Sequence, residues 1–165
     1  MRWSWSAYAL LTAPAVLWST GLFAASIAHS SGWDGLAFAT RLLYSPVCHQ
    51  DAARSFVIAG WPMNVCHRCS GIYLSFTVML LILPWFRARW LRHSVSVRRL
   101  AIFVLPLLLD YALDVLGVWR NSAMSRLLSG VVAGAGLALF VLPAWMEVWT
   151  SRRHRGIHHS EEASR

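Results

Sequence analysis

The chain has 165 residues, of which 57% are hydrophobic, and its mean hydropathy of +0.49 is too high for an ordinary soluble domain. Its formal net charge of +8 is carried by 15 arginines, with no lysine in the sequence. Because these arginines cluster between apolar segments, they fit the topology signals of a membrane protein, and we exclude a nucleic-acid-binding surface.

Four apolar segments are long enough to cross a bilayer, whose hydrocarbon core of about 30 Å needs roughly 20 helical residues. They are residues 7–28, 71–86, 100–119 and 127–149. The first segment carries no charge and is longer than the apolar part of a signal peptide, so we expect it to stay as a span. The sequence therefore predicts an all-α membrane protein with four transmembrane helices in a single domain over residues 1–150.

Two arginine-rich segments indicate how these spans are oriented. Residues 87–99 contain five arginines, and the basic tail at 151–165, which we expect to be disordered, contains four. The positive-inside rule places both segments and both termini on the cytoplasmic side. We therefore expect a multi-pass protein of the bacterial inner (plasma) membrane, surrounded by the lipid bilayer, with the loop at 29–70 on the exoplasmic side.

This exoplasmic loop is long enough to hold structure of its own. Residues 35–44 are amphipathic and predict a short helix at the membrane interface. Residues 54–59 and 64–67 predict the two strands of a small hairpin, because Gly-Trp-Pro at 60–62 between them favours a turn.

All three cysteines of the chain lie in the same loop. The candidate metal ligands are Cys48, His49, Cys66 and Cys69. The C-x-x-C pair can bind one ion, and Cys48 with His49 would complete a tetrahedral Cys₃His site for Zn²⁺ or another thiophilic ion. Since adjacent residues rarely chelate one ion comfortably, Cys48 and His49 need not both bind, and His29 and His67 are spare ligands.

Two other interpretations of the cysteines stay open. A C-x-x-C that faces an oxidising compartment can form a disulfide or a thiol relay, which would make the protein an oxidoreductase. His67 and Arg68 inside the motif would favour the thiolate form. Alternatively, one structural disulfide from Cys48 to Cys66 or Cys69 would hold the loop in a protein with a structural or assembly role. The sequence does not decide whether the protein is an enzyme.

Asp110 and Asp114 lie four residues apart within the third span, and hence on one face of its helix. A charge at the centre of a bilayer costs about 2.5–3.5 kcal/mol, so both carboxylates need partners. The polar candidates expected on the same outer side are Arg54, Arg68, Arg120, Asn121 and Arg126. These residues either pair the helices or line a polar pocket under the cysteine loop, which could bind a metal, a proton or a polar headgroup.

The fourth span contains a GxxxG sequence at Gly130 and Gly134. Small residues at this spacing allow two helices to approach closely. We expect this face to pack inside the bundle, with a homo-oligomer or a membrane-protein partner as the alternative.

The polar residues of the loop and the spans also form a recognisable pattern. Its elements are Cys48-His49-Gln50, Arg54-Ser55-Phe56, Cys66, Arg68, Cys69, Gly71, Ile72 and Tyr73, and later Asp110, Asn121, Arg126, Gly130 and Gly134. This pattern resembles the prokaryotic membrane-protein family catalogued as domain of unknown function 2085, with its motif CHQ…RSF…CxRCxGIY, over residues 44–140. His67 stands where the family pattern has a small residue, and Asp51-Ala52-Ala53 stands in place of Pro-Glu. The resemblance implies that these residues matter, but it implies no reaction.

Overall fold

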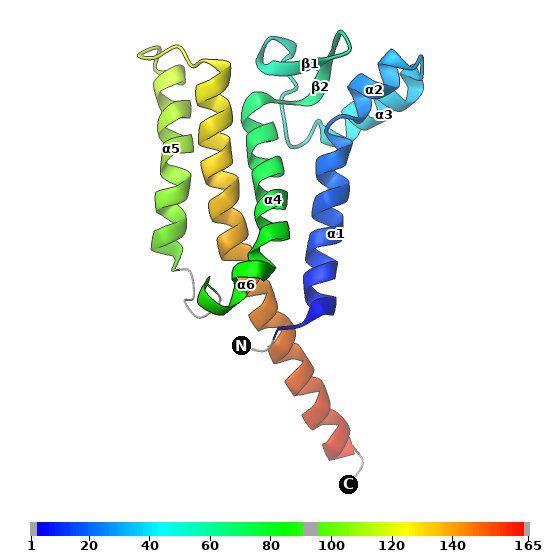
Figure 1. The fold of residues 1–165 in the computed structure, drawn as a ribbon, viewed down its shortest axis with the longest axis vertical. Coiled ribbons are helices and arrows are strands. Elements are labelled where there is room, and N and C mark those ends of the chain that lie inside the picture. The colour runs from blue at the N-terminus through cyan, green and yellow to red at the C-terminus, as the bar shows by residue number, and fades with distance from the viewer. Residues whose placement is uncertain (1–2, 91–95, 164–165) are drawn as a thin grey trace.

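The computed structural model describes residues 3–90 and 96–163, and in these ranges the chain forms six α-helices and one two-stranded sheet. The helices are α1 (Trp5–Gly21), α2 (Ala24–Ser30), α3 (Asp34–Tyr44), α4 (His67–Trp90), α5 (Val97–Val115) and α6 (Ala123–Ala163), and the strands are β1 (Ser55–Ile58) and β2 (Trp61–Cys66). Helices α1, α4, α5 and α6 run side by side, and α2, α3 and the sheet gather at one end of them (Figure 1). We call residues 24–66 at this end the cap.

Helices α4 and α6 form the central pair of the bundle, and two glycines allow their close contact. A Cβ atom at Gly130 would collide with the carbonyl oxygen of Arg68, and one at Gly134 with that of Ile72. Only glycine therefore lets the two backbones approach this closely. The expected packing of the GxxxG face inside the bundle is confirmed, and a homo-oligomer through it is not supported because α4 covers it.

The first predicted span is not one continuous helix. It breaks after Gly21, and α2 leaves the axis of α1 at an angle of 40°. The Asn64 side chain donates a hydrogen bond to the carbonyl oxygen of Gly21 over 2.9 Å, and its backbone N–H donates to that of Leu22 over 3.3 Å. These bonds satisfy carbonyl groups that the break leaves without helical partners. No pattern in the apolar run predicted this break.

Helix α5 lies at the edge of the bundle and packs chiefly on α6 (Figure 1). None of its residues is fully buried. A Cβ atom at Gly136 of α6 would collide with the Phe103 side chain of α5, so glycine allows the two helices to pack closely there. A helix is confirmed in the region expected over residues 100–119. It ends at Val115, two residues before Gly117, which has a φ of 70°.

By length and composition, two helical segments of the described chain can cross a membrane: His67–Trp85 in α4 and Ala123–Ser151 in α6. A third span exists if the bent pair α1 and α2 counts as one. Helix α5 does not qualify, since Arg98, Arg99, Asp110 and Asp114 give it four charges. The mostly helical fold with candidate membrane spans is therefore confirmed, whereas four spans are not. Helix α6 also continues to Ala163, through the segment expected to be disordered.

The cap contains the helix and the hairpin that the loop sequence predicts. Helix α3 covers the expected residues, and β1 pairs with β2 in antiparallel fashion. The turn is tighter than expected and consists of Ala59 and Gly60, which have φ values of 51° and 84°. Tyr44 is buried against α1, and its hydroxyl donates a 2.5 Å hydrogen bond to the carbonyl oxygen of Trp18. This contact fixes the cap on the end of the bundle.

Candidate metal centre and charge cluster

The three cysteines meet where the cap joins the bundle. Cys48 follows α3, Cys66 is the last residue of β2, and Cys69 lies in the first turn of α4. Their Sγ atoms all lie within 4.8 Å of one another, and all three thiols are free. The structure thus brings together the three cysteines that the sequence proposed as ligands, and we call them the sulfur group.

Local hydrogen bonds fix the sulfur group at the start of α4. The backbone N–H of Cys66 donates to Sγ of Cys48 over 3.2 Å, and Sγ of Cys69 lies 3.9 Å from the carbonyl oxygen of Val47. Cys48 is buried, whereas Cys66 and Cys69 are partly accessible. The three sulfurs are therefore held close together, and two of them are partly accessible.

Electrostatics at this helix start favour a thiolate at Cys66. The pKa of its thiol lies well below the usual range, because the Cys48 and Cys69 thiols hydrogen-bond to its sulfur. The backbone N–H groups of Cys69 and Arg68 add to this effect. A thiolate is the form of cysteine that binds metals and that attacks disulfides.

The histidines proposed as ligands do not join the sulfur group in the described part of the chain. The His49 side chain is exposed, and its role as the fourth ligand stays a prediction. His29 instead pairs with Asp34 over 2.7 Å and stacks on Trp61. His67 is buried, its ring packs edge-on against Phe56, and its Nδ1 has no hydrogen-bond partner.

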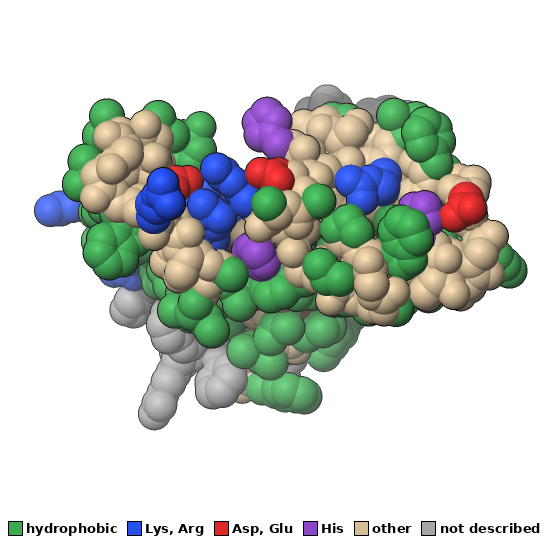
Figure 2. All heavy atoms as spheres, turned by 90° about the horizontal axis from the view of Figure 1, so that it is seen from above, with side chains coloured by type: hydrophobic (Ala, Val, Ile, Leu, Met, Phe, Trp, Pro, Cys, Tyr) green, Lys and Arg blue, Asp and Glu red, His purple; other side chains and the backbone are tan. Residues whose placement is uncertain are grey.

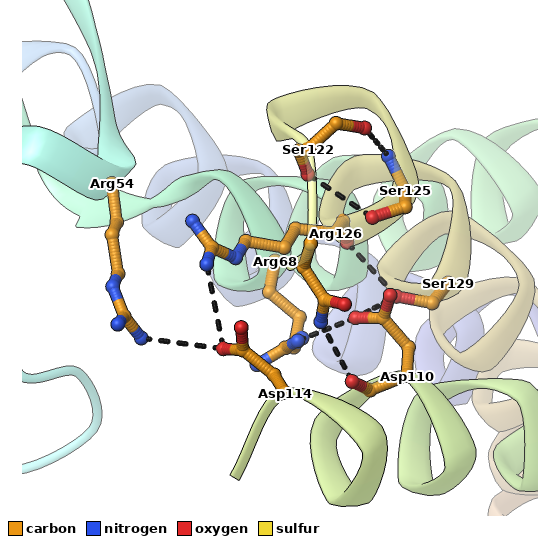
Figure 3. Close-up of polar contacts among 9 residues, drawn as sticks. Arg54, Arg68, Asp110, Asp114, Ser122, Ser125, Arg126 and Ser129 are labelled. Carbon is orange, nitrogen blue, oxygen red and sulfur yellow. Dashed lines mark hydrogen bonds and ion pairs between the residues drawn. The ribbon is translucent and has the colours of Figure 1, made fainter. Parts of the chain in front are cut away.

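A second group of polar side chains lies at the same end of the bundle. It consists of Arg54, Arg68, Asp110, Asp114 and Arg126, and we call it the charge cluster. Figure 3 shows these side chains converging from the hairpin side, α4 and α6 onto the two aspartates near the end of α5. From outside, Figure 2 shows arginine and aspartate side chains gathered beside one another on the face that carries the cap.

Each aspartate has its own arginine partner. Arg68 pairs with Asp110, and the Arg68 guanidinium also lies over the Tyr111 ring at 5.5 Å. Arg126 Nη2 lies 3.4 Å from Asp114 Oδ2, and Arg54 Nη1 reaches the same oxygen at 3.6 Å (Figure 3). The expected pairing of carboxylates with arginines is thus present in the structure, while a binding role for the cluster stays a prediction.

Asn121 also lies in this region, but it bonds to the backbone of Asp110 and not to a carboxylate. Its side chain donates to the backbone carbonyl oxygen of Asp110 over 2.6 Å. Two residues that the sequence interpretation missed are Ser129, whose hydroxyl donates to Asp110 Oδ2 over 3.4 Å, and Asp51, which pairs with Arg54 over 3.2 Å. Ser129 lies three residues after Arg126 on the same helix face, and this spacing could have revealed it.

Comparisons with known proteins agree with the sequence pattern. The family model described as "Predicted membrane protein (DUF2085)" matches residues 48–140. An uncharacterised protein of Methanocaldococcus jannaschii is 29% identical over 119 residues, which cover 72% of this chain and 76% of the relative. An uncharacterised protein of Methanothermobacter thermautotrophicus is 31% identical over 97 residues, which cover 56% and 82%.

No solved structure matches the chain. Both relatives are archaeal, so the comparisons do not support the bacterial assignment made from the sequence. The family model spans both the sulfur group and the charge cluster and covers more than half of the chain. The chain therefore belongs to the family of predicted membrane proteins DUF2085.

Proposed function

We propose that the protein is a multi-pass membrane protein in which Cys48, Cys66 and Cys69 bind a thiophilic metal ion such as Zn²⁺. One observation carries this proposal: the three Sγ atoms lie within 4.8 Å of one another and belong to free thiols. In a tetrahedral zinc site, Zn–S bonds of about 2.3 Å separate the sulfurs by about 3.8 Å. Small rotations of the side chains bring the sulfur group to this spacing.

The donor set also suits a soft cation, because thiolates prefer Zn²⁺ and Cu⁺ over hard ions. Such an ion would join the loop after α3, the end of β2 and the first turn of α4, and so hold the cap on the bundle. Three cysteines leave a fourth position, which the exposed His49 or an external ligand would take. The site would thus serve either to stabilise the cap or to handle metal.

In this proposal the membrane surrounds all four long helices. The bent pair α1 and α2 counts as one span, and the charges at the end of α5 are compensated by the ion pairs of the charge cluster. The start of α1 and the end of α6 lie opposite the cap (Figure 1). Helix α4 ends and α5 begins at that opposite end, and the sequence from 87 to 99 is rich in arginine. The positive-inside rule therefore makes the cap exoplasmic.

Elemental analysis tests the metal site directly. The protein is purified in mild detergent without chelator and without metal-affinity resin, beside Cys66→Ser and the control His29→Gln. About one thiophilic ion per chain is expected in the wild type and in His29→Gln, and less than a tenth of that in Cys66→Ser, because the variant keeps two of three thiolates. A wild-type protein without metal contradicts the proposal.

A thiol relay is the second candidate, favoured by the lowered pKa of Cys66 and the nearness of Cys69. Oxidation would join their sulfurs and pass two electrons and two protons to an acceptor disulfide. Titration with glutathione buffers separates the two functions. A relay gives a reversible Cys66–Cys69 disulfide that is indifferent to chelator, whereas a metal site protects the thiols until chelator is added.

A further inference from the structure

The charge cluster has more hydrogen-bond donors than acceptors. Arg68 and Arg126 each direct one Nη2 atom to an aspartate, and the Nε atoms of both are buried without a partner. A guanidinium carries five N–H donors and no acceptor. Buried donors of a charged group that stay unpaired are costly, so a further acceptor at the cluster would be favourable.

The ends of two helices add positive charge at the cluster, which also favours a negatively charged ligand. Arg68 and Arg126 lie in the first turns of α4 and α6, and neither first turn contains an acidic residue. The N-terminus of a helix carries partial positive charge, which an arginine there increases. Two such ends, both with an arginine, therefore lie next to each other.

The existing carboxylates satisfy this demand only in part. Asp114 lies 3.4 Å from Arg126 and 3.6 Å from Arg54, and these distances exceed the 2.7–2.9 Å of strong charge-assisted hydrogen bonds. The Arg54 side chain is half exposed, so it can turn toward a ligand without a change in the backbone. Arg54 also pairs with Asp51 over 3.2 Å. A ligand with several acceptor oxygens would give Arg54 and Arg126 more hydrogen bonds than these single carboxylate contacts do.

The position of the cluster along the helices indicates the kind of ligand. The two candidate spans begin at His67 and Ala123, so Arg68 and Arg126 lie at their cap-side ends. In the orientation proposed above, these ends lie near the lipid headgroups. Lipid phosphate groups lie at that depth in both leaflets, and charge-assisted hydrogen bonds from arginine can bind them. Arginine suits phosphate because its planar fork donates two parallel hydrogen bonds.

We propose that Arg54, Arg68 and Arg126 form a binding site for a phosphate group at the cap end of the bundle. Its source is either a phospholipid headgroup or a soluble phosphorylated molecule. Asp114 occupies part of this site when phosphate is absent and competes with it. The proposal does not depend on a metal at the sulfur group.

The test uses the whole protein in mild, uncharged detergent. Binding of dihexanoyl phosphatidylglycerol and of inorganic phosphate is measured by calorimetry, with dihexanoylglycerol, which lacks phosphate, as the control lipid. Binding of both phosphates indicates a general phosphate site, and binding of the phospholipid alone indicates a headgroup site. Binding of neither, or equal binding of the control lipid, overturns the proposal.

Three variants then test which residues bind. Arg126→Lys keeps the charge but loses the fork, and we expect a dissociation constant about tenfold higher. Arg120→Gln, the control, removes an exposed arginine of the neighbouring loop and should change binding less than twofold. Asp114→Asn removes the competing carboxylate and should tighten binding. Weaker binding in Asp114→Asn, or equal weakening in Arg120→Gln, overturns the proposal.

A fold check accompanies these variants, because Arg126 is mostly buried. Where Arg126→Lys lacks the helical circular-dichroism spectrum of the wild type, Arg54→Gln replaces it, since the half-exposed Arg54 side chain tolerates substitution. Arg54→Gln should raise the dissociation constant several-fold, and unchanged binding in this variant contradicts the proposal.

Discussion

The sulfur group and the charge cluster lie at the same end of the bundle, but they are assembled in different ways. The sulfur group draws on residues 48–69, a short stretch whose hairpin returns the chain to its start. The charge cluster joins residues from 54 to 126 on the hairpin side and on three helices. We therefore expect the sulfur group to depend on the fold of the cap and the charge cluster to depend on the packing of the helices.

The largest effect is expected from Asp110→Asn, which breaks the charge cluster alone. The Arg68 and Asp110 side chains are 15% and 11% exposed, and removing one partner of a largely buried ion pair costs about 3 kcal/mol. Unfolding in graded sodium dodecyl sulfate should show this loss, with metal content unchanged. The control Asp34→Asn alters an exposed carboxylate and should cost less than about 0.5 kcal/mol. Equal losses in both variants would contradict the assignment.

An intermediate effect is expected from Gly130→Ala, which acts between the two regions. The added methyl group collides with the carbonyl oxygen of Arg68, and overpacking of this kind costs about 2 kcal/mol. Because Arg68 lies between Cys66 and Cys69, this variant should disturb metal binding as well as stability. Gly35→Ala, where nothing lies within 4 Å, is the matched control. Normal metal binding in destabilised Gly130→Ala would show that the two regions are uncoupled.

The smallest effect on stability is expected from Asn64→Ala, which acts on the cap side. It removes the hydrogen bond to the Gly21 carbonyl oxygen, at a cost of about 1 kcal/mol. We expect faster labelling of Cys48 by a thiol reagent, because the cap loosens while the bundle stays folded. Ser30→Ala, which loses only a bond within α2, should label at the wild-type rate. Unchanged labelling in Asn64→Ala would separate the cap from this anchor.

Much of the fold could be predicted from the sequence, because apolar length determines where a helix can cross a membrane. The break after Gly21 could not, since the residue that satisfies its carbonyl group, Asn64, comes from a distant strand. Whether α5 crosses the membrane could not be predicted from its sequence either. Its four charges exclude it from the candidate spans, but the partners of Asp110 and Asp114 come from residues that only the tertiary fold brings near.

The same distinction holds for the site. The nearness of Cys66 and Cys69 follows from their spacing in the sequence. The hairpin that brings Cys66 back to Cys48 could be predicted from its turn residues. The exposure of His49 was not, because its neighbour Cys48 is buried and nothing in the sequence shows which of the two side chains faces inward. For the charge cluster, the sequence predicted which residues need partners, whereas the individual pairs depend on how α5 is turned against α6.

Strand β2 ends at Cys66 and α4 begins at His67, with no linker between them. A tilt of the hairpin must therefore turn the first helical turn, which carries both Cys69 and Arg68. Since α6 packs against the backbone of that turn at Gly130, the turn cannot absorb the rotation locally. We therefore expect a ligand that tilts the hairpin to shift Arg68 as well, and so to change its ion pair with Asp110.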